Sequence, residues 1–334
     1  MRIEDIEPPL NGDSLQSALI RAKNKRGVIA DGLLYEQTIL MVAADPGAGK
    51  STISTQVAVE LAAGLPVFGI FKPPRPMKIL YVQTERSIIE FLERLDVIGK
   101  VLPINRANIY ATDEYQKMNL INAEHSRTFI SCVLRDCPDV DVIFLDPIYS
   151  MVSGGLKDDI PASAFTKAMS LLQKETGAML WYNHHTVKQQ YSNTGGAIEK
   201  EDPFYGSQWI KAHVTGSYYM KKDGDGVKML RKKDNYNLLP GCLDLEYNPE
   251  TGLCCIPLEE APAIERVKVF LRAKEMDRRE FTFKDLEVAT GLCTRTVREV
   301  IAHSSIKERM EIVSSIRNKN LYRISSQNPS CAVQ

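Results

Sequence analysis

The chain has 334 residues, 44% of them hydrophobic and 25% charged, a composition typical of an ordinary globular protein with one large core and a small second domain. Its 42 basic and 42 acidic residues balance, so the overall charge does not indicate binding to nucleic acid or to a membrane. No apolar run reaches the length of a signal peptide or of a membrane-spanning helix, and the seven cysteines show neither a CxxC pair nor zinc-ligand spacing. We therefore expect a cytoplasmic protein with reduced thiols and no membrane partner.

Residues 1–27 are mixed and polar, and we expect them to lead into the first domain, at 28–258. The unbroken apolar run at 38–44 predicts a buried strand, and the spacing of apolar residues at 52–63 predicts a helix that ends at Gly64. The same patterns predict further strands at 78–84, 141–145 and 178–182, and further helices at 87–95, capped by Ser87, and at 161–176.

Apolar strands that alternate with helices indicate an α/β fold whose mostly parallel sheet is covered on both faces. After Gly216 the pattern changes to hairpins. Two short runs, 218–222 and 227–232, flank an Asp-Gly-Asp-Gly turn, and another turn falls at 248–252. We expect these segments to extend the sheet with antiparallel strands.

A second, smaller domain is predicted after a linker at 259–263. Three helices, at 264–273, 283–290 and 294–303, precede a hairpin at 311–324, and residues 327–334 form a tail. Three helices followed by a hairpin predict a winged helix-turn-helix domain at 264–326. From Ala261 onward there are 14 Lys and Arg residues against 9 Asp and Glu, so this domain is the basic part of the chain.

The turn after the first core strand carries the clearest chemical motif. It reads Asp45-Pro46-Gly47-Ala48-Gly49-Lys50-Ser51-Thr52. It lies between a buried strand and the start of a helix, where backbone N–H groups and the helix dipole can hold phosphates. The glycines let the backbone approach oxygen atoms, the lysine can reach the β and γ phosphates of ATP, and the serine hydroxyl can ligate Mg²⁺. We therefore expect all eight residues to bind ATP and Mg²⁺; a chance glycine turn is the alternative.

Ala44 stands where the usual form of this motif, G-x-x-x-x-G-K-[ST], has its first glycine. Alanine is small enough for the end of a strand, so we treat this departure as tolerated. Asp146 ends the apolar run 142–145, a pattern typical of the carboxylate that steadies Mg²⁺ through water or Ser51. Its alternative role is that of a turn aspartate before Pro147.

His184 and His185 follow the strand predicted at 178–182. A polar side chain there could sense the γ-phosphate, and we name His184 as the candidate. A metal pair is disfavoured because adjacent residues of a strand point to opposite faces. A structural role for both histidines is the alternative.

The order of these motifs resembles a known family. The segments that carry the resemblance are Ile29–Leu34, Ala44–Thr52, Leu80–Glu85, Phe144–Pro147 and Asn183–His185, with Lys188 nearby. Together they look like the RepA-type hexameric replicative helicases of plasmids and phages, within the RecA/DnaB-like P-loop ATPases. The resemblance implies a RecA-like core, ATP hydrolysis with Mg²⁺, a ring such as a homo-hexamer, and action on DNA.

In RecA-like sheets the strand predicted at 78–84 would lie beside the phosphate-loop strand. Glu85 would then face the γ-phosphate and activate water; a solvated glutamate at a helix start is the alternative. The family also implies a basic finger that reaches the neighbouring subunit's site. Arg231 and Lys233 are the candidates, although Asp234 interrupts the usual sequence motif of such a finger. A solvated strand end is an equal alternative.

Rings of this kind bind single-stranded DNA through loops, here 153–159 and 187–204. Lys188 and Lys200 are the basic candidates, but the acidic residues of the second loop make it a poor groove for DNA. In the C-terminal domain the candidates for contact with nucleic acid are Arg295, Arg298, Arg317 and Lys319. Protein docking or a structural use is the alternative for that domain.

Two main functions follow from these patterns. The first is a ring-forming DNA helicase that acts on single-stranded or forked DNA. The second is an ATP-switch loader or regulatory DNA-binding ATPase without unwinding activity. A KaiC/RadA-like regulator or recombinase is a third, weaker alternative, since neither the zinc motif of RadA nor the duplicated domain of KaiC is present.

Overall fold

The computed structural model describes most of the chain. The described residues are 27–45, 47–152, 156–186, 204–248, 251–257, 261–277, 280–302, 304–307, 310–316 and 319–324. Several predictions fall wholly or partly outside them: nearly all of the lead-in, residues 259–260 of the linker, the tail, Pro46, residues 153–155 of the first DNA loop, nearly all of the second DNA loop with Lys188 and Lys200, and Arg317.

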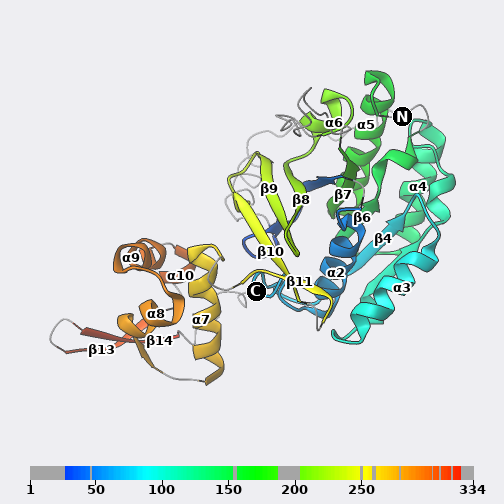
Figure 1. The fold of residues 1–334 in the computed structure, drawn as a ribbon. Coiled ribbons are helices and arrows are strands. Elements are labelled where there is room, and N and C mark those ends of the chain that lie inside the picture. Colours follow the sequence, from blue (N-terminus) through cyan, green and yellow to red (C-terminus); the bar gives the residue numbers. More distant parts are fainter. Residues whose placement is uncertain are drawn as a thin grey trace, which may run out of the picture.

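A mixed sheet forms the centre of the larger domain, and nine of its strands lie among the described residues (Figure 1). Side by side in the parallel part run β8 (Gly216–Asp223), β3 (Ile39–Ala44), β7 (Met179–His185), β6 (Val142–Asp146), β4 (Ile79–Gln83) and β5 (Ile109–Thr112). The antiparallel part continues from β8 through β9 (Gly226–Asp234), β10 (Cys242–Asn248) and β11 (Leu253–Cys255). The predicted α/β class, with a mostly parallel sheet and an antiparallel extension, is confirmed.

Helices cover both faces of this sheet (Figure 1). On one face, α2 (Lys50–Ala63) and α3 (Ile88–Gly99) pack over a core that includes Tyr81 and Phe144. On the other face lie α4 (Ala123–Asp136), α5 (Asp159–Thr176) and α6 (Gln208–His213). Residues alternate between the two cores along β3, β4 and β6, which is why these strands are almost entirely apolar.

The order of the strands corrects one expectation. β4 does not lie beside the phosphate-loop strand β3, because β7 and β6 lie between them. β3 pairs instead with β7 and β8, and β4 pairs with β6 and β5. A helical crossover fixes that two strands run parallel but leaves open how many positions it skips, so the sequence pattern did not determine this order.

Some elements were not predicted. Helix α4 begins after Asn122, whose side-chain oxygen accepts hydrogen bonds from Glu124 N and His125 N at 2.8 and 3.2 Å. A short hairpin pairs β1 (Val28–Ala30) with β2 (Leu34–Tyr35). Single turns of 3₁₀ helix lie at Arg106–Asn108, Glu114–Lys117 and Ile148–Met151.

The C-terminal part contains helices and a hairpin in the predicted order. Its elements are α7 (Ala263–Asp277), β12 (Phe281–Thr282), α8 (Phe283–Thr290), α9 (Thr294–Ala302), α10 (Ser304–Lys307), β13 (Met310–Ile316) and β14 (Lys319–Ile324). The three strands form a separate antiparallel sheet, and a separate core packs around Phe281, Leu286 and Val297. Lys319 lies in β14 rather than in the hairpin turn. Assignment as a winged helix stays a prediction.

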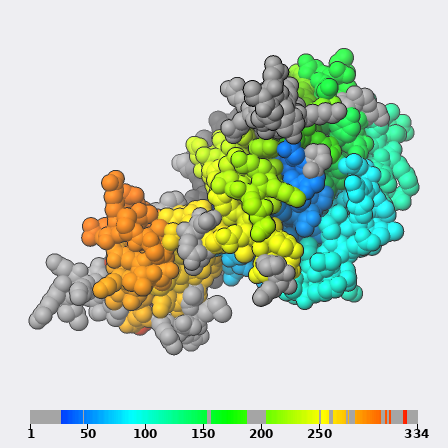
Figure 2. All heavy atoms as spheres, viewed as in Figure 1, coloured from blue at the N-terminus to red at the C-terminus, as the bar shows by residue number. Residues whose placement is uncertain are grey.

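Helix α7 joins this part to the larger domain. Lys268 is buried, and its amine lies 2.5 Å from Asp31 Oδ2 and 2.9 Å from Oε1 of the buried Glu265. Arg272 donates a hydrogen bond to the Ile70 carbonyl at 2.9 Å. In Figure 2 the C-terminal part, in orange, forms a smaller mass beside the larger core. The contacts at α7 are therefore direct and partly ionic.

Within the part of the chain that the structure describes, none of the helices is both long enough and apolar enough to cross a bilayer. The six cysteines found there are free thiols.

Candidate nucleotide-binding site

The phosphate loop begins where β3 ends and closes where α2 starts. Gly47 and Gly49 have φ angles of 75° and 90°, in the left-handed region that glycine adopts without strain. A Cβ atom built at either position would meet no atom within 4 Å, so the loop faces open space. An anion therefore has room in front of the main chain at the start of α2, and the residues present fit a phosphate group.

Lys50, the first residue of α2, reaches back over the loop. Its Nζ donates a hydrogen bond to the carbonyl of Ala44 at 2.8 Å. Burial lowers the pKa of this amine, and the negative charges of Asp146, Asp45 and Glu85 oppose that shift. Ala44, which replaces the usual glycine, is fully buried at the end of β3. The amine is thus surrounded by the carboxylates that the sequence analysis selected.

Asp45 is fixed from the ends of two neighbouring strands, and the sequence pattern did not predict these contacts. The Thr186 hydroxyl, just after β7, donates to Asp45 Oδ1. The Tyr219 hydroxyl, on β8, donates to Asp45 Oδ2 at 3.3 Å. These bonds hold the start of the loop against the ends of both strands.

Asp146 ends β6 on the face of the sheet that α2 covers. The parallel register places it beside Gln83, the last residue of β4. Its side chain is only 3% exposed, and Oδ2 accepts a hydrogen bond of 2.5 Å from the hydroxyl of the fully buried Tyr81. Burial and then the charge of Asp146 raise the pKa of Tyr81, so this hydroxyl remains a donor. Tyr81 was missed, because only the pairing of β4 with β6 brings the two side chains together.

Glu85 reaches the site although its strand is not adjacent to β3. Its carboxylate is half exposed, and Oε2 lies 3.8 Å from His185 Nε2. Burial and the positive charge of Lys50 lower the pKa of His185, while Glu85 and Asp146 oppose this. Lys50, Glu85 and His185 therefore share one electrostatic environment with Asp146.

The structure does not bring His184 to this site. Its ring is fully buried on the opposite face of the sheet, and its Nε2 hydrogen-bonds the Tyr205 carbonyl at 2.5 Å. Burial lowers its pKa to about 4. β7 runs to His185, so the alternation of side chains along the strand turns His185, not His184, toward the phosphate loop.

An aromatic cluster lies beside His185 and was also missed. The Tyr149 ring meets the rings of His185 and Tyr205 edge-on, with centroids 6.2 and 5.9 Å apart. The Lys157 amine lies 5.3 Å from the centroid of Tyr205. Tyr149 is 40% exposed, so part of this cluster faces solvent.

The two finger candidates are bonded within their own chain. Arg231 donates to Asp234 Oδ2 at 3.0 Å and to the Leu239 carbonyl at 2.5 Å. Lys233 Nζ donates to the carbonyls of Lys211 and Ala212, at the end of α6, at 2.7 and 3.0 Å. Burial lowers the pKa of Lys233.

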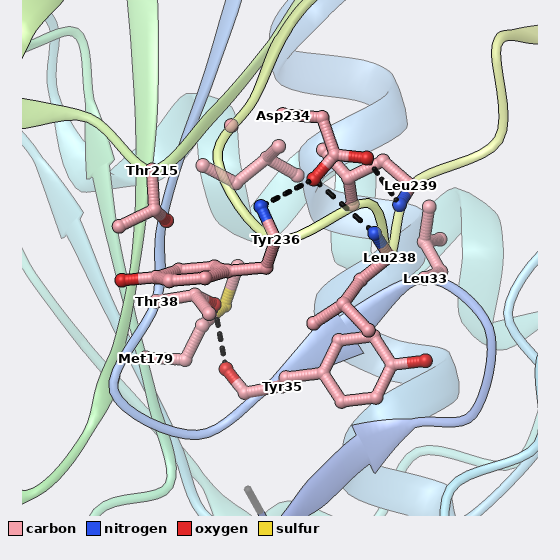
Figure 3. Close-up of a pocket in the computed structure, with 11 residues that line it drawn as sticks. Leu33, Tyr35, Thr38, Met179, Thr215, Asp234, Tyr236, Leu238 and Leu239 are labelled. Carbon is pink, nitrogen blue, oxygen red and sulfur yellow. Dashed lines mark hydrogen bonds between the residues drawn. The ribbon is translucent and has the colours of Figure 1, made fainter.

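Asp234, which interrupts the expected finger motif, has a structural use. Its carboxylate accepts hydrogen bonds from the backbone N–H groups of Tyr236, Leu238 and Leu239 (Figure 3). An aspartate that bonds the chain just after it is a common turn signal. The small hollow beside this loop lies at the amino ends of β3 and β8, away from the phosphate loop. Its volume of about 20 Å³ suits a water molecule rather than a nucleotide.

The described candidates for nucleic-acid contact lie in the C-terminal part. Arg295 and Arg298 are exposed on α9, and Arg295 Nε pairs with Glu299 Oε1 at 3.0 Å. The backbone of Lys319 lies in β14, and its side chain is outside the described residues.

Comparison with known proteins places this site in a family. A family model described as an AAA domain, AAA_25, matches residues 12–191, more than half of the chain. The chain belongs to this family. Its members are P-loop ATPases with a RecA-like core, and membership implies a bound nucleotide with Mg²⁺. The match includes the phosphate loop, Glu85, Asp146 and His185.

Among solved structures, the chain is similar to a KaiC-like protein from the hyperthermophilic archaeon Pyrococcus horikoshii. The identity is 13% and the TM-score 0.47, over 69% of this chain and 93% of that chain. None of the curated proteins compared with the chain matches it.

Proposed function

We propose that this chain hydrolyses ATP with Mg²⁺ at the site between β3 and α2. The observation that carries the proposal is the Lys50 amine, held at an open glycine loop within the field of three carboxylates, Asp146, Asp45 and Glu85. Lys50 and the loop amides would hold the phosphates, and Ser51 and Asp146 would hold the metal ion. When bound, Mg²⁺ neutralises charge on the phosphate oxygens.

Glu85 is our candidate for the base that takes a proton from water. It lies two residues after the end of β4, whose last residue, Gln83, pairs with Asp146, and half of its side chain is open to solvent. His185, 3.8 Å away, can hold the carboxylate in position and takes the sensing role that we first gave to His184. A base in this position typically accelerates a reaction by about 10²- to 10⁴-fold.

The test of this assignment is Glu85→Gln beside Lys50→Ala. Glu85→Gln should keep the affinity for ATP and lose turnover by about 100-fold or more, because an amide cannot accept the proton. Lys50→Ala should weaken binding as well, because the phosphates lose their cation. Normal turnover in Glu85→Gln would remove Glu85 as the base.

We further propose that hydrolysis drives a ring, such as a homo-hexamer, along single-stranded or forked DNA, as in a replicative-type helicase. The cluster of Tyr149, Tyr205 and Lys157 supports this proposal, since the exposed Tyr149 ring close to a cation suits a stacked base. It lies beside His185, so strand binding and the γ-phosphate position would be adjacent. Arg295 and Arg298 on α9 would add phosphate contacts.

Strand displacement from a forked DNA with ATP tests the motor, with Lys50→Ala as the inactive control. Native mass spectrometry with and without ATP tests the ring. Tyr149→Ala should lower the affinity for single-stranded DNA by about tenfold, measured by fluorescence anisotropy, because one stacked base contributes about 1–3 kcal/mol. Tyr247→Ala, which removes an exposed tyrosine of β10, is the matched control.

An ATP-switch loader without unwinding activity is the second candidate, and one observation favours it. Arg231 and Lys233 are both bonded inside their own chain, so neither extends toward a neighbouring subunit. Arg231, with 36% of its side chain exposed, remains our finger candidate and would have to exchange its bonds with Asp234 and Leu239. ATP hydrolysis without strand displacement would leave the loader as the function.

A further inference from the structure

We propose that Tyr81 is a positioning residue that fixes the Asp146 carboxylate for the metal ion. The inference rests on the proposed ATP and Mg²⁺ site and adds a residue to it. Tyr81 lies on β4, and its hydroxyl donates to Asp146 Oδ2 at 2.5 Å. This bond leaves Oδ1 to face a metal ion or a water molecule bound to it.

The ring of Tyr81 has little freedom to move. It is fully buried, and its centroid lies 4.4 Å from that of Phe91 on α3 and 5.6 Å from that of Phe144 on β6. Packing against two aromatic rings fixes the hydroxyl, and through it the carboxylate. A buried charge needs such a partner, since without one its desolvation is costly.

Strand β7, on the other side of β6 from β4, has a similar arrangement. Trp181, on β7, packs against Phe144 with centroids 5.4 Å apart, and its Nε1 donates to Asn183 Oδ1 at 3.0 Å. Asn183 also accepts a hydrogen bond from Ser54 of α2 at 2.9 Å. A row of aromatic rings thus supports a row of polar side chains at the edge of the site. Tyr81 is the ring of this row that bonds the metal-ligand candidate directly.

Such partners of a ligand typically change metal affinity by about 10- to 100-fold when they are removed. The test variant is Tyr81→Phe, which keeps the ring and removes the hydroxyl. The matched control is Tyr182→Phe. Tyr182 is also fully buried, on the opposite face of the sheet, and its hydroxyl has no hydrogen-bond partner among the described residues.

The readout is the affinity for a fluorescent ADP, measured in EDTA and then at rising Mg²⁺ concentration. Tyr81→Phe should bind ADP in EDTA as the unmodified protein does. It should need about tenfold or more Mg²⁺ to reach half of the metal-dependent gain in affinity. Tyr182→Phe should match the unmodified protein in both conditions. A side chain with a merely structural role would not shift the Mg²⁺ midpoint selectively.

An unchanged Mg²⁺ midpoint in Tyr81→Phe would overturn this inference and leave the proposed ATPase intact. Absence of ADP binding by the unmodified protein would overturn both. The bond is also measurable without metal, from the unfolding free energies of Tyr81→Phe, Asp146→Asn and the double variant in EDTA. Additive effects in that cycle would show that the two side chains do not interact, which also overturns the inference.

Discussion

The carboxyl group of Glu60 lies inside the core, on the same helix as Lys50. It is 5% exposed and accepts hydrogen bonds from Gln56 Nε2 at 2.9 Å and from the Phe68 N–H at 3.1 Å. Burial raises its pKa from the ordinary 4.5 to about 8, and the two hydrogen bonds only partly oppose this. The folded chain therefore keeps a proton on Glu60 that the unfolded chain releases.

This difference sets the sign and size of a pH effect on stability. The stabilising contribution of the protonated Glu60 to the free energy of unfolding is fully present below pH 4.5 and is lost as the pH rises to about 8. Within that window each pH unit lowers the free energy of unfolding by at most about 1.4 kcal/mol. Two histidines, the buried His184 and the half-buried His213, act in the opposite direction. Their pKa values are lowered to about 4, so stability falls as the pH drops below 6.5.

The range from pH 6.5 to 8 therefore isolates Glu60 from these histidines. Glu60→Gln removes the titrating group. From pH 6.5 to 8 the free energy of unfolding of this variant should therefore fall by about 2 kcal/mol less than that of the unmodified chain. Urea unfolding followed by circular dichroism, at fixed ionic strength and several pH values, measures the difference. Glu93→Gln, at an exposed position of α3, is the control. Parallel pH curves for Glu60→Gln and the unmodified chain would refute the reasoning.

Two further predictions concern buried charge and the paired histidines. Lys268→Met should lower the free energy of unfolding by about 3–5 kcal/mol, because it leaves the buried Glu265 without its partner; Lys284→Met, at an exposed site, should have little effect in the same denaturation assay. His185→Asn should lower ATP turnover with little change in melting temperature, whereas His184→Asn should lower the melting temperature. The reverse pattern, scored by ATPase assay and thermal unfolding, would contradict the assignment of the two faces of β7.

Local patterns predicted the parts of the fold that depend on neighbours in sequence. The glycine turn that opens α2, the Ser87 cap and the helix Phe283–Thr290 with its left-handed Gly291 all appear as expected. Each is specified by hydrogen bonds and backbone angles within a few residues, so the sequence around it contains the needed information.

The remaining features depend on how distant segments meet. The place of β4 in the sheet depends on the segments that fill the positions between it and β3, and these come later in the chain. Tyr81 gained its partner Asp146 only through that order. Whether His184 or His185 faces the phosphate loop depends on how far β7 extends. The strand ends at His185, three residues beyond the predicted end. Such properties follow from register and topology, which single-strand patterns do not encode.

Helix α2 connects the phosphate loop with the far side of the domain through direct contacts. At its start Lys50 bonds the Ala44 carbonyl, and in its middle Gln56 exchanges two hydrogen bonds with the backbone of Cys254, at 2.6 and 2.9 Å. Glu60 then holds the Phe68 N–H. The carbonyl of Ile70, two residues after Phe68, accepts a hydrogen bond from Arg272 of α7. Because these buried bonds are costly to leave unpaired, a shift of α2 must either carry β11 and this segment with it or break the bonds. The positions of the phosphate loop and of the C-terminal part thus both depend on helix α2.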